Sequence, residues 1–277
     1  MKRLLILSVL LCGTILAAAQ TTKEDFLRRY NNLVDRVGPT GVGVETLLDN
    51  WAAAYPEDDQ QMLARFAFCF ARSQSSQVIE LDRDRYLGNA PLLPMTDSLG
   101  VKHNYFEDTV YDDDLFADAL QMIDQAIATK SWKLDYRFMK TNATLAYEKE
   151  SPDMALQQLK SLADEHFTRH PSWVYEGVEK VGDEEFCAFM QDYCAAIFRI
   201  GSDASAEAFK SLSEHLLTFF FAHGFYIAVG KSVTGDDQYK KKIHSNHNIT
   251  FLSSTIMLSV AKISEGVSQK SGHPSGF

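Results

Sequence analysis

Residues 119–126 read ALQMIDQA, and residues 155–162 read ALQQLKSL, thirty-six positions later. Beyond the shared triplet Ala-Leu-Gln, the two copies also correspond along the chain: Ile123 with Leu159, and Ala126 with Leu162. Apolar and small residues at this spacing fall on one face of a helix. Self-similarity at a period of 20–50 residues is typical of proteins built from stacked helical repeats.

A third copy is expected at Ala208 and Leu212, after a helix that ends at Gly201. It follows the second copy by fifty-three residues rather than thirty-six. The surplus lies in an inserted loop at residues 170–183, which holds Trp173 and is marked by proline and glycine. The sequence therefore predicts three degenerate copies of a two-helix unit.

This pattern resembles the second helix of tetratricopeptide repeats, in which a small, an apolar and a small residue line the packing between helices. Ala119, Ile123 and Ala126 match these positions, whereas Leu162 is larger than the family pattern. The resemblance covers residues 59–220 and rests on periodicity. It implies an all-α fold of stacked helical hairpins, a tetratricopeptide-like (TPR-like) right-handed α-solenoid, which binds proteins or peptides along a groove lined by the first helices.

Three amphipathic helices are expected before the first complete repeat. The first spans residues 21–37, begins with a capping box of Thr22 and Asp25, and ends at Gly38. The second has its apolar positions within residues 44–55, and the third spans residues 59–72. Short turns marked by proline or glycine join them, which favours antiparallel packing.

Residues 74–110 interrupt the helical periodicity with prolines and glycines. Two stretches, residues 92–96 and 101–106, flank the sequence Asp-Ser-Leu-Gly, in which aspartate opens and glycine closes a type I turn. A short β-hairpin inserted in the helical domain is therefore expected. Residues 104–108 at its end either face a ligand or cover the core, and we favour the covering role.

The N-terminus has the three parts of a secretory signal: Lys2 and Arg3, an apolar run at residues 4–16, and three alanines at residues 17–19. The run is shorter than the ~20 residues of a membrane span. We therefore expect a signal peptide at residues 1–19, no membrane span, and a periplasmic or extracellular location, with association with the outer membrane left open. Cys12 leaves a lipid anchor as the alternative, although Leu11 stands where such signals need a small residue.

The signal, the Tyr-Pro-Glu-Asp sequence at residues 55–58 and the turn at residues 97–100 also look like those of secreted repeat proteins of Gram-negative bacteria. That likeness implies no known activity.

The helical domain is expected at residues 20–220 and an irregular tail at residues 221–277. From residue 217 the chain has nine serines, four of the eight histidines and no arginine. The tail is either a natural cap or, the slightly favoured explanation, a shifted reading frame that replaced further repeats; resequencing the gene separates the two.

The charge of residues 20–216, with 34 acidic and 19 basic side chains, speaks against nucleic acid as a partner. Phosphate binding needs clustered lysines and arginines.

Three cysteines follow the signal, namely Cys69, Cys187 and Cys194, and an odd number cannot all pair within one chain. Cys187 and Cys194 would lie about 10 Å apart along a helix, beyond the ~7 Å limit for a disulfide. Three buried, unpaired cysteines are expected.

Candidate chemistry is sparse. His166 and His170 have a metal-ligand spacing on a helix, but Phe167 stands where a zinc-peptidase motif has an acidic residue. Residues 112–114 are three aspartates without the glycine and glutamate of a calcium loop, so they are expected to begin a helix. Nucleophile elbows, phosphate-binding loops and Cys-x-x-Cys pairs are absent from the sequence. We expect no catalytic residue, cofactor or metal.

These patterns predict a non-catalytic scaffold that binds a protein or peptide in the cell envelope. Four residues on the expected first helices of the second and third copies would contact the partner: Arg137, Asn142, Asp192 and Arg199. The acidic charge favours basic or polar partners whose binding weakens with salt. A bracing role in an envelope assembly would use other surfaces instead. The alternative function is a cell-envelope hydrolase with its site at the hairpin and the Trp173 loop, tested at Asp108, His166 and His170.

Overall fold

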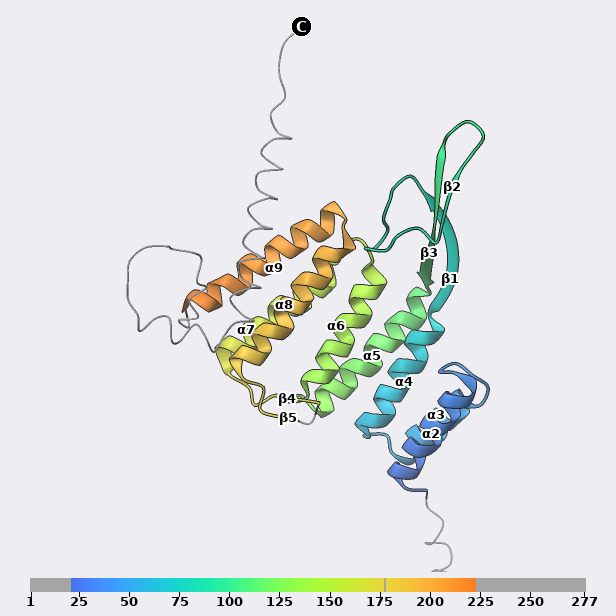
Figure 1. Cartoon of the computed structure of the whole chain (residues 1–277). Helices are drawn as coiled ribbons and strands as arrows, with labels where there is room; N and C mark the ends of the chain where they lie inside the picture. Colours follow the sequence, from blue (N-terminus) through green and yellow to red (C-terminus); the bar gives the residue numbers. More distant parts are fainter. Residues whose placement is uncertain (1–20, 177, 223–277) are drawn as a thin grey trace, which may run out of the picture. The chain divides into compact units, whose positions relative to one another are not determined.

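The structure, a computed structural model, describes residues 21–176 and 178–222 (Figure 1). In this part the chain forms eight α-helices, which hold 63% of the residues, and a three-stranded antiparallel sheet. The predicted, mostly helical fold is thus confirmed. The chain divides into two compact units: one comprises residues up to Gln77 and Asp108–Lys140, the other Val78–Glu107 and residues from Thr141 on. The expected signal peptide and most of the expected tail, residues 223–277, lie outside the described residues.

Three helices begin the first unit: α2 (Lys23–Val37), α3 (Val44–Ala54) and α4 (Asp59–Arg72). All three lie within two residues of their predicted bounds. The hydroxyl of Thr22 accepts a hydrogen bond from the backbone nitrogen of Asp25 at 3.2 Å, and so caps the start of α2 as predicted. Helix α3 packs against α2 and α4. The rings of Phe26 and Trp51 stack with centroids 5.9 Å apart in the core of this helix group.

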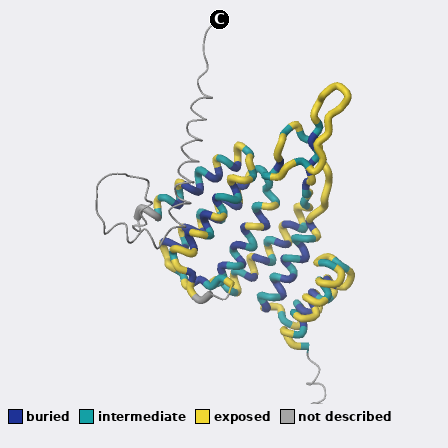
Figure 2. The backbone as a smooth tube through the Cα atoms, viewed as in Figure 1, coloured by how far each residue is buried: buried dark blue, intermediate teal, exposed yellow. Residues whose placement is uncertain are grey.

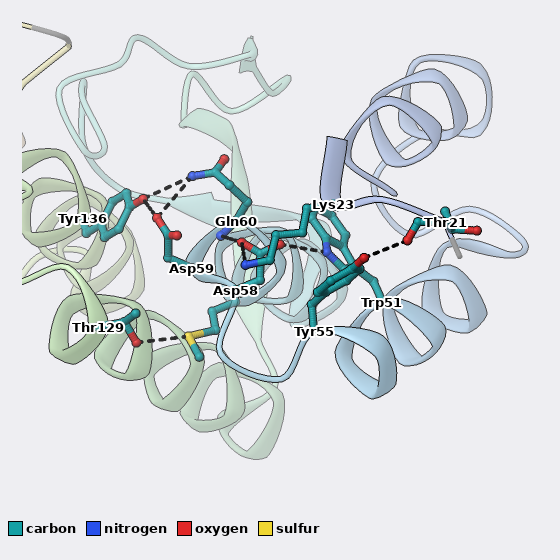
Figure 3. A network of polar contacts seen from close by, with 10 residues as sticks. Thr21, Lys23, Trp51, Tyr55, Asp58, Asp59, Gln60, Thr129 and Tyr136 are labelled. Carbon is teal, nitrogen blue, oxygen red and sulfur yellow. Dashed lines mark hydrogen bonds and ion pairs between the residues drawn. The ribbon is translucent and has the colours of Figure 1, made fainter. Parts of the chain in front are cut away.

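A polar network at the start of α4 joins these helices to α6 (Leu134–Glu148), as Figure 3 shows. The indole Nε1 of Trp51 donates to Oδ2 of Asp58 at 3.0 Å, and Nζ of Lys23 lies 3.8 Å from Oδ1 of the same carboxylate. The hydroxyl of Tyr136 donates to Asp59. Burial, and after it this hydrogen bond, raises the pKa of Tyr136. The network fixes where α4 begins relative to α3.

Helix α4 also packs along α5 (Asp113–Thr129), although residues 73–112 lie between them in the chain. The backbone nitrogen of Asp112 donates to the carbonyl of Ser73 at 2.8 Å, so the inserted segment leaves and re-enters the helix pair at adjacent points. The Asp112 carboxylate accepts from the backbone nitrogen of Leu115 at 2.9 Å, which confirms the predicted acidic helix start. The repeat positions of α5 have no exposed surface: Ala119, Ile123 and Ala126.

The inserted segment forms β1 (Gln74–Leu81), β2 (Leu93–Thr96) and β3 (Lys102–Tyr111), in the sheet order β1-β3-β2. Strands β2 and β3 pair antiparallel from Leu93↔Tyr105 to Thr96↔Lys102. The carbonyl of Asp97 accepts from the backbone nitrogen of Gly100 at 3.1 Å, so the predicted hairpin and its turn are confirmed. The prediction of a hairpin alone is incomplete, because β1 adds a third strand. That strand begins Gln-Ser-Ser-Gln and has little apolar alternation.

The second unit contains α7 (Asp153–Arg169), α8 (Asp183–Ile200) and α9 (Asp203–Ala222), with α9 packed against both others. The repeat positions of α7 and α9 are buried: Ala155, Leu159, Leu162, Ala208 and Leu212. Between α7 and α8 lie two short antiparallel strands, β4 (Val174–Tyr175) and β5 (Val178–Glu179), in place of the irregular loop expected there. Helix α9 ends at Ala222 and so includes the first two residues of the predicted irregular tail.

Candidate binding site

The three-stranded sheet has one face with exposed apolar side chains. Side chains at alternate positions of a strand lie on the same side of a sheet. In β2 and β3, Leu93 lies opposite Tyr105 and Met95 opposite His103. A ring nitrogen of His103 contacts the carboxylate of Glu80 in β1, so Glu80 and the residue two positions before it share this side. We name the resulting surface the outer face: Val78, Glu80, Leu93, Met95, His103 and Tyr105.

The two sides of the sheet differ in burial. On the outer face, Val78, Leu93 and Met95 are 61%, 51% and 50% exposed. On the opposite side, Asn104 and Phe106 of β3 are buried, whereas β2 is exposed on both sides. The predicted covering role of residues 104–108 therefore fits these two residues but not Tyr105, which belongs to the outer face. Figure 2 shows the exposed hairpin in yellow. Because β3 already packs in the core through its other side, the apolar residues of the outer face are not needed to close the core. Such exposed apolar groups are typical of surfaces that dock a partner.

A strip of charged residues crosses the outer face. His103 lies between Glu80 and Asp97, with its Nε2 3.6 Å from Oδ2 of Asp97. The hydrogen bond with Glu80 raises the pKa of His103 above its ordinary value and lowers the pKa of Glu80. The pKa of Asp97 is lowered chiefly by the hydrogen bond that its carboxylate accepts from the backbone nitrogen of Val101. The apolar residues thus lie beside a polar strip of fixed geometry.

We expect Glu80→Gln to lower the pKa of His103, because the protonated imidazole then loses its anionic partner. A raised folded-state pKa means that the His103 contact stabilises the hairpin fully below the unfolded value of ~6.5 and is lost as pH rises through the folded value. The lowered pKa of Glu80 has the opposite sign, so its contribution is lost as pH falls through its folded value. The contact between Glu80 and His103 therefore stabilises the hairpin most at pH values between the folded-state pKa of Glu80 and the folded-state pKa of His103.

An NMR titration of the His103 ring measures this effect. The exposed Glu57 offers a control, since Glu57→Gln removes the same charge elsewhere in the chain. A His103 pKa that is the same in Glu80→Gln and in the unchanged protein would contradict the observed pairing.

The four residues predicted to contact a partner are distributed over both units. Arg137 belongs to the first unit and the other three to the second. Arg137 is half-buried, whereas Asn142, Asp192 and Arg199 are exposed. The Asn142 Oδ1 accepts a hydrogen bond from the Tyr193 hydroxyl at 2.8 Å, which joins α6 to the helix that carries Asp192 and Arg199. Arg199 lies at the C-terminal end of α8, where it lines a cavity.

The residues named for the hydrolase alternative differ in how far they are buried. Asp108 and His166 are 6% and 2% exposed, so neither is open to a substrate. Nε2 of His166 lies 2.9 Å from Oδ1 of Asp183, and the imidazole stacks on Phe186 with centroids 3.9 Å apart. His170 is the exposed left-handed cap of α7, with φ 46°, so the two histidines do not share one helix face as their spacing suggested.

Trp173, expected to mark a site loop, is instead a core residue with 1% of its surface exposed. Its ring stacks on His166 with centroids 5.4 Å apart. The loop therefore closes the end of the helix pair through an aromatic cluster. Sequence reasoning placed Trp173 in a loop correctly but could not tell which side of the loop it faces.

A second polar cluster, between α7 and α9, was not singled out from the sequence. Nζ of Lys160 donates to Oγ of Ser211 at 2.7 Å, and Nε2 of His215 lies 2.9 Å from Oδ1 of Asp164. In each contact the two residues are 51 positions apart in the chain and belong to different helices. The only sequence signal for this cluster is that its two residues in each helix are four positions apart, which places them on the same helix face. The two contacts lie one helical turn apart, and both join α7 to α9.

The described residues offer no ready metal centre. Within residues 21–176 and 178–222, no group of three or more histidine, cysteine, aspartate or glutamate residues is placed to hold a metal ion. Cys69, Cys187 and Cys194 are buried and unpaired there, as predicted. Burial raises the pKa of the Cys187 and Cys194 thiols to about 12. In the same part of the chain, the helices are too short or too polar to cross a lipid bilayer.

Comparison with protein-family models, curated proteins and solved structures finds no match for this chain. The resemblance to tetratricopeptide repeats consequently rests on the sequence pattern.

Proposed function

We propose that this protein is a non-catalytic scaffold that binds another protein in the periplasm or outside the cell, and that the outer face is its main docking surface. The carrying observation is the exposure of Val78, Leu93 and Met95 beside β3, a strand whose other side packs in the core through Asn104 and Phe106. Export rests on the signal-type sequence at residues 1–19.

The chemistry of the outer face favours a partner with an apolar contact surface. Fully burying a leucine or methionine is worth about 1.5–3 kcal/mol, so burying the exposed half of each side chain contributes about 1 kcal/mol. The strip of Glu80, His103 and Asp97 adds little affinity, since both carboxylates are exposed and the imidazole is half-exposed, but it restricts the orientation in which a partner binds.

A TPR-like stack of helical hairpins is the arrangement that we propose for the helices. Within each unit, helices that follow each other in the pattern pack together: α4 with α5, and α8 with α9. Helix α7 also packs on α9, as second helices of successive repeats would. The small buried residues Ala119, Ala155 and Ala208 allow helices to approach closely at these positions.

The test is retention of envelope proteins on the immobilised protein, compared between two double variants. Leu93→Ser with Met95→Ser removes two apolar side chains from the outer face. Val42→Ser with Met154→Ser is the matched control, because these side chains are also exposed, at 93% and 44%, and lie outside the sheet, before α3 and in α7. With a purified partner, we expect the outer-face variant to bind at least tenfold more weakly, since about 2 kcal/mol is lost.

The informative result is one protein retained by the unchanged chain and by the control but lost from the outer-face variant. Equal retention by both variants would show that the outer face is not the docking surface. Circular dichroism and urea unfolding of each variant establish that the fold is kept.

The groove predicted from the resemblance is the second surface to compare. The variants are Arg137→Glu, Asn142→Asp, Asp192→Lys and Arg199→Glu, combined in one chain. If the partner lies along the first helices, these changes release it and its retention falls as salt rises. A partner retained equally well by the fourfold variant excludes the groove and leaves the outer face in place.

A further inference from the structure

A cavity of about 760 Å³ lies in the second unit, where the C-terminal end of α8, the start of α9 and the turn at residues 85–89 meet. Its walls are largely apolar, formed by Leu87, Ala196, Phe198, Ile200 and Ala206. Charged residues also line it, namely Arg85, Arg199 and Asp203. Volumes of 300–1,000 Å³ with mostly apolar walls and a few polar groups are typical of small-molecule sites.

The turn that forms one wall is held tightly. Tyr86 and Asn89 exchange both backbone hydrogen bonds, at 3.0 and 2.9 Å. The two residues between them, Leu87 and Gly88, have φ values of 49° and 79°, which makes a two-residue turn of the kind that normally takes asparagine or glycine. A leucine in the left-handed region costs about 1–2 kcal/mol. Strain of this sort is often retained where a side chain has a binding role, and Leu87 lines the cavity.

The turn also packs closely against α8. A Cβ atom on Gly88 would lie 2.5 Å from the carbonyl oxygen of Arg199, so the backbones approach as closely as only glycine permits. Behind the turn, Tyr86 is buried against Phe106 with ring centroids 5.9 Å apart. The cavity wall is therefore fixed by packing before any ligand arrives.

The charge of the cavity is opposite to that of the chain as a whole. Two arginines and one aspartate line it, whereas the chain has a net charge of −10. Nη1 of Arg85 donates to the carbonyl of Gly88 at 2.9 Å, which leaves its other N–H groups to donate elsewhere. Within the described residues, Arg85 and Arg199 make no ion pair with an acidic side chain. The guanidinium groups are thus available to an anion from outside.

We propose that this cavity binds a small amphipathic carboxylate, with the carboxylate on Arg85 and Arg199 and the apolar part against Leu87, Phe198 and Ala206. Arginine pairs with carboxylates through two parallel hydrogen bonds, which suits a monovalent head group. Phe198, which lines the cavity and is 44% exposed, offers an aromatic surface for the apolar part. Two sources supply this chemistry: a free fatty acid of medium chain length, or the apolar last residue of a peptide. The site is separate from the outer face and does not depend on it.

The test uses two matched pairs of probes: octanoate with octanamide, and N-acetyl-leucine with N-acetyl-leucinamide. Binding is followed by NMR chemical shifts of the full chain, below the concentration at which octanoate forms micelles. We expect the carboxylate of one pair to shift the signals of Leu87, Ala196 and Ala206 and to bind at least tenfold more tightly than its amide. The pair that binds identifies the source.

The double variant Arg85→Gln with Arg199→Gln should lose at least tenfold in affinity for the carboxylate. Arg29→Gln with Arg36→Gln is its control, since it removes two exposed positive charges from α2 and should bind as the unchanged chain does. Binding should also weaken as salt is raised. The proposal is overturned if neither carboxylate binds in the millimolar range, if carboxylate and amide bind equally, or if the two double variants behave alike.

Discussion

Replacing Trp51 by alanine is expected to lower the free energy of unfolding by about 3–5 kcal/mol. The side chain has no exposed surface, and its ring stacks on Phe26. Its Nε1 also donates to Asp58, a carboxylate that is only 5% exposed. The substitution therefore opens a cavity and removes a hydrogen bond from a buried charge, which are two separate mechanisms of destabilisation.

Trp132→Ala is the matched control for this prediction. Trp132 is 46% exposed, and Nζ of Lys130 lies 5.1 Å from its ring centroid, a contact worth about 0.5–1 kcal/mol. Urea unfolding of both variants, followed by circular dichroism, measures the difference. Comparable losses in the two variants would mean that α2, α3 and α4 do not share the packed core described for the first unit.

The second large effect is expected at Gly88. Gly88→Ala places a Cβ atom 2.5 Å from the Arg199 carbonyl oxygen and also forces alanine to a φ of 79°. Gly100 separates the two contributions, because its φ is 83° and nothing lies within 4 Å of an added Cβ atom. We expect Gly100→Ala to cost about 1 kcal/mol through its backbone conformation.

Gly88→Ala should then cost about 1–3 kcal/mol more than Gly100→Ala, the range typical of a forced overlap in a packed region. Urea midpoints of the two variants give this comparison directly. The turn would also have to move away from α8, so NMR signals of residues that line the cavity should shift in Gly88→Ala only. Equal stability of the two variants would contradict the close approach of the turn to α8.

The sequence was a good guide wherever a structure is decided by neighbouring residues. Thr22 and Asp112 cap the helices that they were expected to begin, and Gly201 ends α8 in the left-handed conformation. Caps act within one turn, so their residue types can be read without knowing the rest of the fold. The buried repeat positions were found for a similar reason, since the helical period marks one face.

The parts that the sequence did not indicate depend on contacts between distant residues. Strand β1 is held by its pairing in the sheet, and its sequence carries almost no alternation of its own. The outer face becomes apparent only once the register brings β2 beside β3. The sequence predicts Arg199 as a charged position on a helix, but no residue near it in the chain indicates that Arg85 and Leu87 line the same cavity. A positive φ at Leu87 has no sequence signal at all, because leucine disfavours it.

The hydrogen bond between Asp112 and Ser73 brings together the two ends of the segment that carries the outer face. Both ends meet at one place, so α4 and α5 pack together although this segment separates them in the chain. The entropy of closing such a loop grows only with the logarithm of its length, so doubling the segment adds about 0.6 kcal/mol. Insertions at the exposed tip of the hairpin, residues 97–100, are therefore expected to cost α4 and α5 little stability, whereas changes at Tyr86, Gly88 or Phe106 would disturb the packing of the second unit.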